Sequence, residues 1–263
     1  MKTNRFLLIC IFAMIVSLLL FSASAMRHNQ RAVTDSVNRQ IATDPVEGIA
    51  VLELFTSQGC SSCPPADALL AGYAKAGDPH IIPLSFHVDY WNRLGWTDPF
   101  SNHLFSERQE WYSSLFPGGS VYTPQLVVNG NAETVGNNRA SVGKLVQNAL
   151  KTAVSGHIAV DNVMIENGNL YFHYTLSGSL HSEMLHIALI EKAATTQIRA
   201  GENKGVTISN HNIVRVFKTV NPAGDSQESI ALPPGFQKLE YALVLYTQDR
   251  RKGTITTAMM QSL

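Results

Sequence analysis

Two cysteines, Cys60 and Cys63, form a Cys-Ser-Ser-Cys sequence directly after the apolar segment 51–55. That segment predicts a buried strand. The proline pair 64–65 predicts the first turn of a helix, because only that turn tolerates residues without an N–H donor. We therefore expect the helix to begin at about Ser62, with Cys60 just ahead of it. A helix N-terminus stabilises a thiolate and lowers the thiol pKa, so the pair is a candidate for thiol redox chemistry.

The N-terminal residues predict an export signal. A basic start, a long apolar stretch and the small-residue sequence Ala23-Ser24-Ala25 favour cleavage after residues 1–25. The alternative is an uncleaved membrane anchor, which would act as a membrane tether. Residues 26–47 are polar and aperiodic, so we expect a flexible tether. Cys10 would leave with the signal, and the exported protein, periplasmic or secreted, would keep only the Cys-Ser-Ser-Cys pair.

An exported chain with two cysteines is expected to form one disulfide. A purely structural bridge remains an alternative, although a loop this short constrains the unfolded chain little. The 263 residues contain 20 basic and 20 acidic side chains. The signal holds two basic and no acidic residues, so its removal leaves 18 against 20 and a formal charge of −2. We therefore expect no nucleic-acid partner and no anionic-membrane partner.

Residues 48–153 predict the element order β-α-β-α-β-β-α. The expected strands cover 51–55, 82–88, 125–128 and 132–135, and the expected helices cover about 62–77, 98–114 and 138–150. Pro83 predicts that the second strand lies at a sheet edge, because proline cannot donate to a sheet ladder. Asp98 is the expected cap of the second helix. Asn129-Gly130 is a strong signal for a hairpin turn.

Residues 156–263 have a different sequence pattern, which predicts closely spaced strands and no helix as long as those expected in residues 48–153. The expected strands cover 157–166, 170–176, 185–198, 212–220, 239–247 and 254–260. Short strands with regular turns predict a β-sandwich-like domain appended to the first one. The polar segment 201–205 is expected to be a turn between two of these strands.

The order of elements around the Cys-x-x-Cys and Thr-Pro sequences resembles the thioredoxin fold over about residues 48–153. A narrower resemblance is to a family of secreted bacterial thioredoxin-like proteins described only as a domain of unknown function. The matching segments are 59–64 (Gly-Cys-Ser-Ser-Cys-Pro), 87–91 (His-Val-Asp-Tyr-Trp), 94–96 (Leu-Gly-Trp) and 121–125 (Val-Tyr-Thr-Pro-Gln). The resemblance implies an α/β thioredoxin-like domain followed by a β-rich, sandwich-like region.

The resemblance also implies roles for single residues. Cys60 would be the attacking thiol and Cys63 the resolving thiol. Pro124 would be the cis proline opposite the dithiol, with the backbone of Thr123 pairing with an extended substrate segment. Glu53 would be the buried acid that accepts the proton of the resolving thiol, although it lies seven residues before the first cysteine, where thioredoxins usually have six. The other interpretation of Glu53 is a simple pair with a neighbouring donor.

Four residues follow the carboxyl end of the second expected strand, where ligands of open α/β sheets gather. We expect them to wall a substrate groove beside the dithiol, the alternative being a self-packed loop; they are Asp89, Tyr90, Trp91 and Trp96. A copper(I) site built from Cys60, Cys63 and His87 is a further alternative, with His103 or Asp89 as an added ligand.

The expected function is that of an exported thiol–disulfide oxidoreductase. Its partners would be protein or peptide thiols and disulfides, and no organic cofactor is implied. The alternative is a non-catalytic thioredoxin-like binding module or a copper(I)-binding protein. The prediction requires that Pro124 and the two sulfurs meet at an edge that water can reach.

Overall fold

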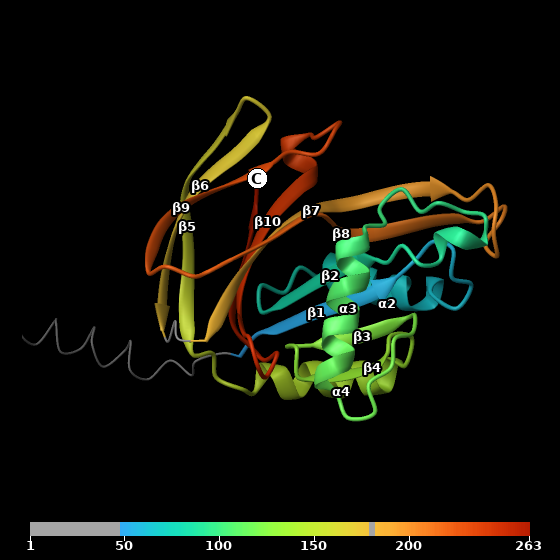
Figure 1. Ribbon diagram of the computed structural model, residues 1–263, viewed down its shortest axis with the longest axis horizontal. Coiled ribbons are helices and arrows are strands. Elements are labelled where there is room, and N and C mark those ends of the chain that lie inside the picture. Colours follow the sequence, from blue (N-terminus) through green and yellow to red (C-terminus); the bar gives the residue numbers. More distant parts are fainter. Residues whose placement is uncertain (1–47, 179–181) are drawn as a thin grey trace, which may run out of the picture. The chain divides into compact units, whose positions relative to one another are not determined.

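The computed structural model describes residues 48–178 and 182–263. Residues Glu47–Leu263 form one compact unit with mixed α/β structure, a large sheet and few helices (Figure 1). The expected signal and tether, 1–47, lie outside the described residues. No helix in the described part of the chain is long and apolar enough to cross a membrane.

The first part of the unit has the predicted order of elements. These are β1 (Ala50–Thr56), α2 (Pro64–Ala76), β2 (Ile81–His87), η1 (Asn92–Leu94), α3 (His103–Leu115), β3 (Gln125–Val128), β4 (Ala132–Val135) and α4 (Arg139–Leu150). Local signals explain several boundaries. Gly77 ends α2 with φ 66°, Asn129 and Gly130 turn the β3–β4 hairpin with φ 46° and 65°, and Asn138 caps α4 by accepting a hydrogen bond from Ser141 N.

The predicted start of α3 at Asp98 is wrong. The helix begins at His103, and its cap is Asn102, whose side chain accepts a hydrogen bond from Leu104 N. Asp98 instead binds groups far along the chain, including the imidazole of His87 at 2.7 Å. A tertiary ion pair has therefore taken the residue that local preference would use as a cap.

The predicted edge position of Pro83 is also wrong, because β2 lies inside the sheet. The strand pairs along its length with β1, whereas it meets β8 only at Ser85 and Ile213. The carbonyl of Pro83 faces β8 and accepts a hydrogen bond from Asn212 Nδ2 at 2.9 Å. The missing N–H of the proline falls on this sparsely paired side, so no regular ladder is broken.

The second part of the unit contains only strands and one short 3₁₀ helix. These elements are β5 (Gly156–Glu166), β6 (Asn169–Gly178), β7 (Glu183–Gln197), β8 (Thr207–Val220), β9 (Asp225–Ala231), η2 (Lys238–Glu240), β10 (Tyr241–Asp249) and β11 (Ile255–Ser262). Strands β5, β6 and β9 form a separate three-stranded sheet. The other four strands join the strands of the first part in one sheet, in the order β11-β10-β7-β8-β2-β1-β3-β4. The sequence did not indicate this continuation or strand β9.

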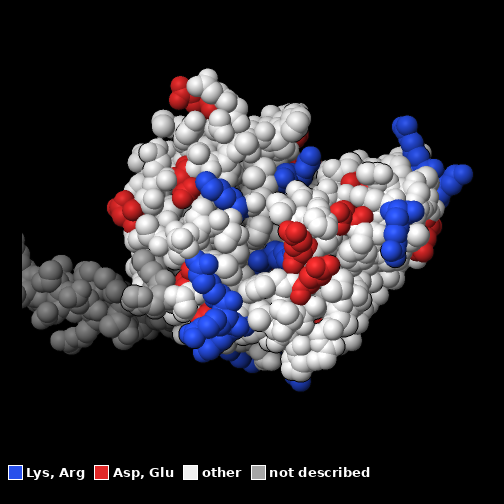
Figure 2. Space-filling view, viewed as in Figure 1, with Lys and Arg blue, Asp and Glu red and all other residues white. Residues whose placement is uncertain are grey.

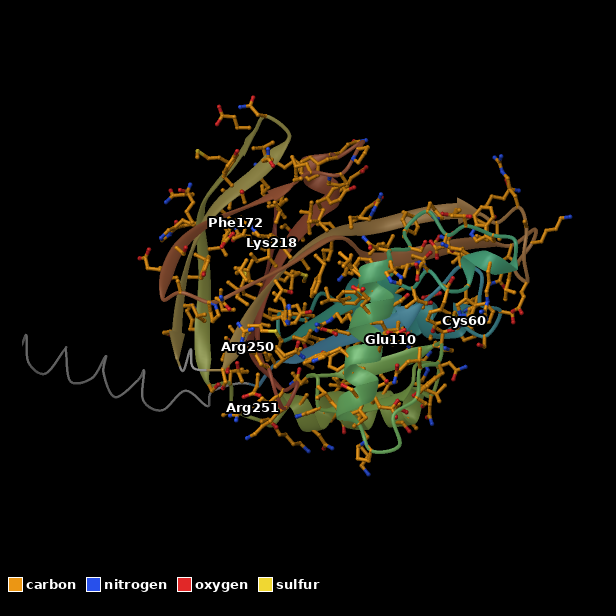
Figure 3. All side chains as sticks on the ribbon, in the orientation of Figure 1. Cys60, Glu110, Phe172, Lys218, Arg250 and Arg251 are labelled. Atoms are coloured by element: carbon orange, nitrogen blue, oxygen red, sulfur yellow. A yellow bond between two sulfur atoms is a disulfide. The ribbon has the colours of Figure 1, made fainter. Side chains whose placement is uncertain are left out.

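Three hydrophobic clusters hold these layers together. Helix α3 covers one face of the large sheet, where Phe105 and Tyr112 pack on β1 and β2. Helices α2 and α4 cover the opposite face with Leu70 and Val146 (Figure 1). The small sheet packs against β7 and β10 through a third cluster that includes Phe172. Phe172 and Cys60 lie at opposite sides of the unit, so the cysteine pair is remote from the small sheet (Figure 3).

Candidate functional site

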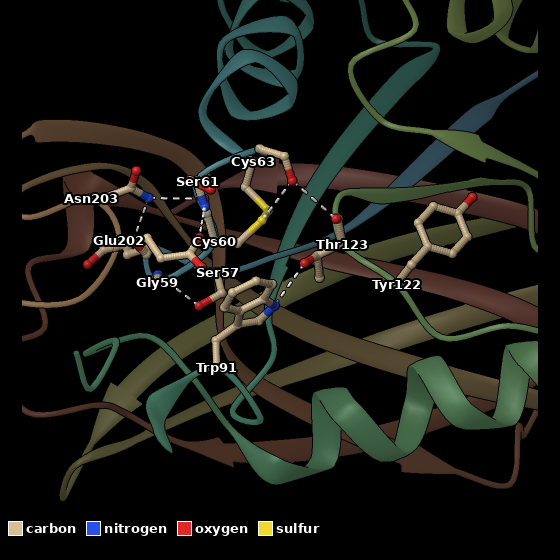
Figure 4. Close-up of a disulfide and its surroundings, with 12 residues drawn as sticks. Ser57, Gly59, Cys60, Ser61, Cys63, Trp91, Tyr122, Thr123, Glu202 and Asn203 are labelled. Carbon is tan, nitrogen blue, oxygen red and sulfur yellow. Dashed lines mark hydrogen bonds between the residues drawn. A yellow bond between two sulfur atoms is a disulfide. The ribbon is translucent and has the colours of Figure 1, made fainter. Parts of the chain in front are cut away.

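Cys60 and Cys63 are joined by a disulfide at the start of α2 (Figure 4). Strand β1 ends at Thr56, and the chain then makes two tight turns, in which Cys60 N donates to Ser57 O at 3.1 Å and Cys63 N donates to Cys60 O at 3.2 Å. Cys63 is the N-cap of α2, and prolines occupy the next two positions. The predicted junction of strand, dithiol and helix is therefore confirmed.

The Thr123–Pro124 segment lies beside the disulfide, as the sequence predicted. Its peptide bond is cis. Ser62 Oγ donates to the carbonyl of Thr123 at 3.4 Å, and Trp91 Nε1 donates to Thr123 Oγ1 at 2.8 Å (Figure 4). Ser62 Oγ also lies 3.3 Å from Cys60 Sγ. Two segments sixty residues apart in the sequence therefore meet at the disulfide.

The expectation that water reaches the sulfurs is wrong for this oxidised form, because Cys60 and Cys63 are each 0% exposed. The tip of the β7–β8 hairpin, residues 198–206, lies against the cysteine loop. Asn203 Nδ2 donates to Gln58 O at 2.9 Å and to Cys60 O at 3.0 Å, and the Glu202 carboxylate accepts from Ser61 N at 3.2 Å. The segment is a turn, as predicted, but it is also part of the site.

The four expected groove residues divide into two pairs. Trp91 and Trp96 lie at the cysteine loop, since Trp91 binds Thr123 and Trp96 Nε1 donates to Gln58 Oε1 at 3.2 Å. Asp89 and Tyr90 bind α3 instead. Asp89 accepts from Ser106 Oγ at 2.6 Å, and Tyr90 OH donates to Gln109 Oε1 at 3.1 Å. The structure therefore brings the two tryptophans to the cysteine loop, and Tyr90, which also forms a side-chain hydrogen bond with Thr123, lies between this loop and α3, whereas Asp89 binds α3.

Glu53 does not contact either cysteine. Its neighbours Leu52 and Leu54 pack with α2, and strand alternation therefore turns Glu53 to the α3 face of the sheet. There its carboxylate accepts from Arg108 Nη2 at 2.6 Å and from Tyr246 OH at 2.6 Å. The interpretation of Glu53 as a paired structural acid is confirmed. The spacing of seven residues rather than six explains the outcome, because an odd shift along a strand changes the face.

A different acid, Asp67, lies next to the disulfide. It follows Cys63 by four residues on α2, so the two side chains are neighbours on one helix face. Burial raises the pKa of Asp67 to about 6, against the attraction of His87, which lowers it. At neutral pH this carboxyl group is therefore close to its titration range, as proton exchange with a thiol requires.

His87 and Asp98 form a buried pair beneath the same site. His87 Nδ1 lies 2.7 Å from Asp98 Oδ2, and both side chains are fully buried. Burial has the largest single effect on the pKa of His87 and lowers it, but the charge and hydrogen bond of Asp98 and the charge of Asp67 together raise the pKa above its usual value. Asp98 also accepts from Gln58 N at 2.8 Å, which links the pair to the residue two before Cys60. The pair is a charged element directly under the cysteine loop.

The buried polar atoms that lack a hydrogen-bond partner in the described residues gather around this cluster. They are Thr56 Oγ1, both carboxylate oxygens of Asp67, Ser85 Oγ, His87 Nε2 and Asn210 Nδ2. Thr56 and His87 are partners in the β1–β2 register. His87, by its charge, and Thr56 and Asn210, by weak side-chain hydrogen bonds, lower the pKa of Asp67 against the larger effect of burial. A buried polar atom without a partner costs about 1–3 kcal/mol, and such a concentration is typical of functional sites.

The copper(I) alternative is not supported by the geometry. Within residues 48–178 and 182–263, no group of three or more His, Cys, Asp or Glu side chains is arranged to hold a metal ion. His87 binds Asp98 rather than facing the sulfurs. His103, the possible added ligand, lies 3.1 Å from Asp89 and 3.7 Å from Glu107 on the α3 side.

Comparison with known proteins places the chain in a family. Residues 51–248 match the family model described as "Protein of unknown function (DUF1223)". The chain belongs to this family. The match includes the cysteine loop, the Thr-Pro segment, the buried cluster and the hairpin tip that binds the cysteine loop. No curated protein matches the chain significantly.

Two solved structures are similar to the chain. The crystal structure of protein AGR_C_4864 from Agrobacterium tumefaciens is 26% identical, with a TM-score of 0.63 over 82% of this chain and 95% of that chain. A domain of the outer membrane lipoprotein Omp28 from Porphyromonas gingivalis is 13% identical over 43% of this chain and 90% of that chain. Its TM-score of 0.27 is too low to support an inference. The first match supports the mixed α/β fold.

Several residues of the site were missed by sequence reasoning. Asp67 had a detectable signal, because it is an acid among the apolar residues of the inward face of α2. The sequence carried no such signal for three other residues, because the hydrogen bonds that place them join segments 143 to 152 residues apart; they are Gln58, Asn203 and Asn210. The β7–β8 hairpin brings Asn203 and Asn210 to the cysteine loop, where Gln58 lies.

Proposed function

We propose that this chain is an exported thiol–disulfide oxidoreductase with thioredoxin-like topology, acting through Cys60 and Cys63 on disulfides of proteins or peptides. One observation carries the proposal: a Cys-x-x-Cys disulfide at a helix start lies one helical turn from Asp67, a buried acid whose pKa burial raises to about 6. The strand order β2-β1-β3-β4, with helices on both faces, supports the topology. The signal-like residues 1–25 support export.

The reaction needs no group beyond the side chains and the substrate disulfide. The Cys60 thiolate attacks one substrate sulfur, forms a mixed disulfide and releases the other substrate sulfur as a thiolate, which takes up a proton. The Cys63 thiol passes its proton to the Asp67 carboxylate. The Cys63 sulfur then attacks Cys60 Sγ, restores the internal disulfide and releases the second substrate thiol. Two electrons pass from the dithiol to the substrate, and the reverse sequence oxidises a substrate dithiol.

The hairpin tip controls access to the sulfurs in this proposal. Both cysteines are buried, so part of the site must move before a substrate sulfur reaches Cys60; the moving part in this proposal is the hairpin tip 198–206, which binds the backbone of the cysteine loop. That movement breaks the two hydrogen bonds that Asn203 donates to the cysteine loop. The half-buried backbone of Thr123 would then align an extended substrate segment beside Cys60 once its hydrogen bond with Ser62 is released.

Trapping variants test the proposal. The wild-type protein is expected to accelerate the reduction of insulin disulfides by dithiothreitol. Cys63→Ser is expected to accumulate a mixed disulfide with a model substrate through Cys60, whereas Cys60→Ser accumulates none. Mass spectrometry of the trapped species and insulin turbidity are the measurements. No acceleration by the wild type, together with no trapped species, would refute oxidoreductase activity.

The burial of both sulfurs favours a second candidate, a non-catalytic binding scaffold with a structural disulfide. Structural disulfides typically have reduction potentials below about −300 mV. A potential in that range together with an absence of turnover would support the scaffold. A higher potential with turnover would support the oxidoreductase.

A further inference from the structure

A pocket of about 390 Å³ lies between α3 and the strands β7 and β8. Its volume falls in the range of about 300–1,000 Å³ that is common for small-molecule sites. Its apolar wall is formed by Leu104, Trp111, Met184 and Phe217. The face of the molecule in front of α3 is shown in Figure 2, where basic and acidic side chains lie beside a hollow in the surface. None of the lining residues belongs to the cysteine loop or to its covering hairpin tip.

Arg108 lines the pocket, and its guanidinium group is only partly used by the protein. Nε and Nη2 donate to the two oxygens of Glu53 at 3.0 and 2.6 Å, and Nη2 also donates to Tyr112 and Gln248. Nη1 has no hydrogen-bond partner among the described residues, although the side chain is only 6% exposed. Nη1 is not fully buried, so it reaches the surface of the pocket that Arg108 lines.

The charges around the pocket disfavour an anionic ligand. Glu53 already neutralises Arg108 within a buried ion pair. Burial, and then the positive charge of Arg108, lower the pKa of His186 well below its usual value, so this imidazole is neutral. Its two nitrogens lie 2.9 Å from Thr219 Oγ1 and 2.8 Å from Gln248 Oε1. Glu107 adds a carboxylate at the rim, where its side chain is 57% exposed.

We infer that this pocket binds a small, uncharged molecule with an apolar body and a carbonyl oxygen. The carbonyl accepts a hydrogen bond from Arg108 Nη1, which has no hydrogen-bond partner within the described residues. The body packs against Phe217 and Trp111, whose ring centroids lie 5.0 and 5.8 Å from the guanidinium carbon. A carboxylate ligand would accept the same hydrogen bond, but its binding would be weaker for two reasons. It would lose its hydration beside an arginine already neutralised by Glu53, and its negative charge would be repelled by Glu107.

Three probes of one shape test the ligand class by calorimetric titration of the whole protein. They are 2-acetylnaphthalene, which has the carbonyl, 2-isopropenylnaphthalene, in which a methylene replaces the oxygen, and 2-naphthoate, which is an anion. The ketone is expected to bind at least about tenfold more tightly than either of the other two probes. The alkene cannot accept the hydrogen bond from Arg108, and the anion loses hydration energy that offsets this hydrogen bond. Equal binding of the alkene, tighter binding of the anion, or no binding of the ketone would each overturn the inference.

A matched pair of variants locates the binding. Leu104→Trp obstructs the mouth of the pocket at a residue that is 53% exposed, so it leaves the Arg108 network intact. Leu239→Trp makes the same change at a residue in η2 that is 82% exposed and outside the pocket. Leu104→Trp is expected to weaken ketone binding at least about tenfold, and Leu239→Trp is expected to leave it unchanged. The same ketone affinity in both variants would place binding elsewhere and overturn the inference.

Discussion

Replacing Asp67 by asparagine is expected to stabilise the oxidised protein at neutral pH. Burial raises the pKa of Asp67 from 3.8 to about 6, so its carboxylate has a cost in the folded state that an isosteric amide lacks. Each unit of pKa shift corresponds to about 1.4 kcal/mol, and the shift therefore corresponds to about 3 kcal/mol. The side-chain hydrogen bonds with Thr56 and Asn210 lower the pKa of Asp67, and the amide oxygen of Asp67→Asn can still accept a hydrogen bond from either of them.

The gain in folding stability from Asp67→Asn increases as the pH rises. Between about pH 3.8 and 6 the folded protein keeps a proton on Asp67 that the unfolded chain has released. The stability of the wild type therefore falls as the pH rises through this window and remains lower above it. Asp67→Asn lacks this part of the pH dependence. The difference between the two proteins is expected to be about 3 kcal/mol at pH 7 and close to zero at about pH 3.

Urea unfolding of the oxidised proteins at both pH values measures the effect. Glu166→Gln is the matched control, since it removes a carboxylate that is exposed on β5. That change is expected to alter the free energy of unfolding by less than about 0.5 kcal/mol. If Asp67→Asn were no more stable than the wild type at pH 7, or gained equally at pH 3 and pH 7, the reasoning about this buried acid would be refuted.

Three further predictions follow from the site and its surroundings. Asn203→Ala removes two hydrogen bonds between the hairpin tip and the cysteine loop, each worth about 1 kcal/mol. This variant is expected to speed reduction of the Cys60–Cys63 disulfide by dithiothreitol about 30-fold. An unchanged rate of thiol release would contradict the proposal that the hairpin tip controls access to the disulfide. Arg108→Met leaves Glu53 buried without its cation and is expected to cost about 3–5 kcal/mol in urea unfolding. The double variant Arg108→Met/Glu53→Met is expected to recover most of that loss, and no recovery would count against the ion pair. Burial lowers the pKa of His87, but Asp98 and Asp67 together raise it above its usual value. The stabilisation of the fold by protonated His87 is therefore complete below pH 6.5 and is lost as the pH rises through the raised pKa. Asp98→Asn is expected to flatten this part of the stability curve, and an unchanged curve would rule out the coupling.

The sequence correctly predicted the structural elements that are set by residues close together in the chain. The strand–dithiol–helix junction follows from an apolar run and two prolines, and the β3–β4 hairpin follows from Asn129-Gly130. The approach of Thr123 to the cysteine loop required the family resemblance in addition to the local pattern. Asp98 shows the limit of such reasoning, because a residue with a strong capping preference became the partner of His87.

The sequence by itself determined where the dithiol lies, which residues turn the chain around it, and that the first part alternates strands and helices. These depend on φ preferences, missing N–H donors and side-chain periodicity within a few residues. The tertiary structure was needed to show that Glu53 faces Arg108 rather than the cysteines, and that Asn203 binds the cysteine loop. The reason is that burial, strand facing and hydrogen bonds between distant segments depend on how β7 and β8 join the sheet, and no local pattern encodes that pairing.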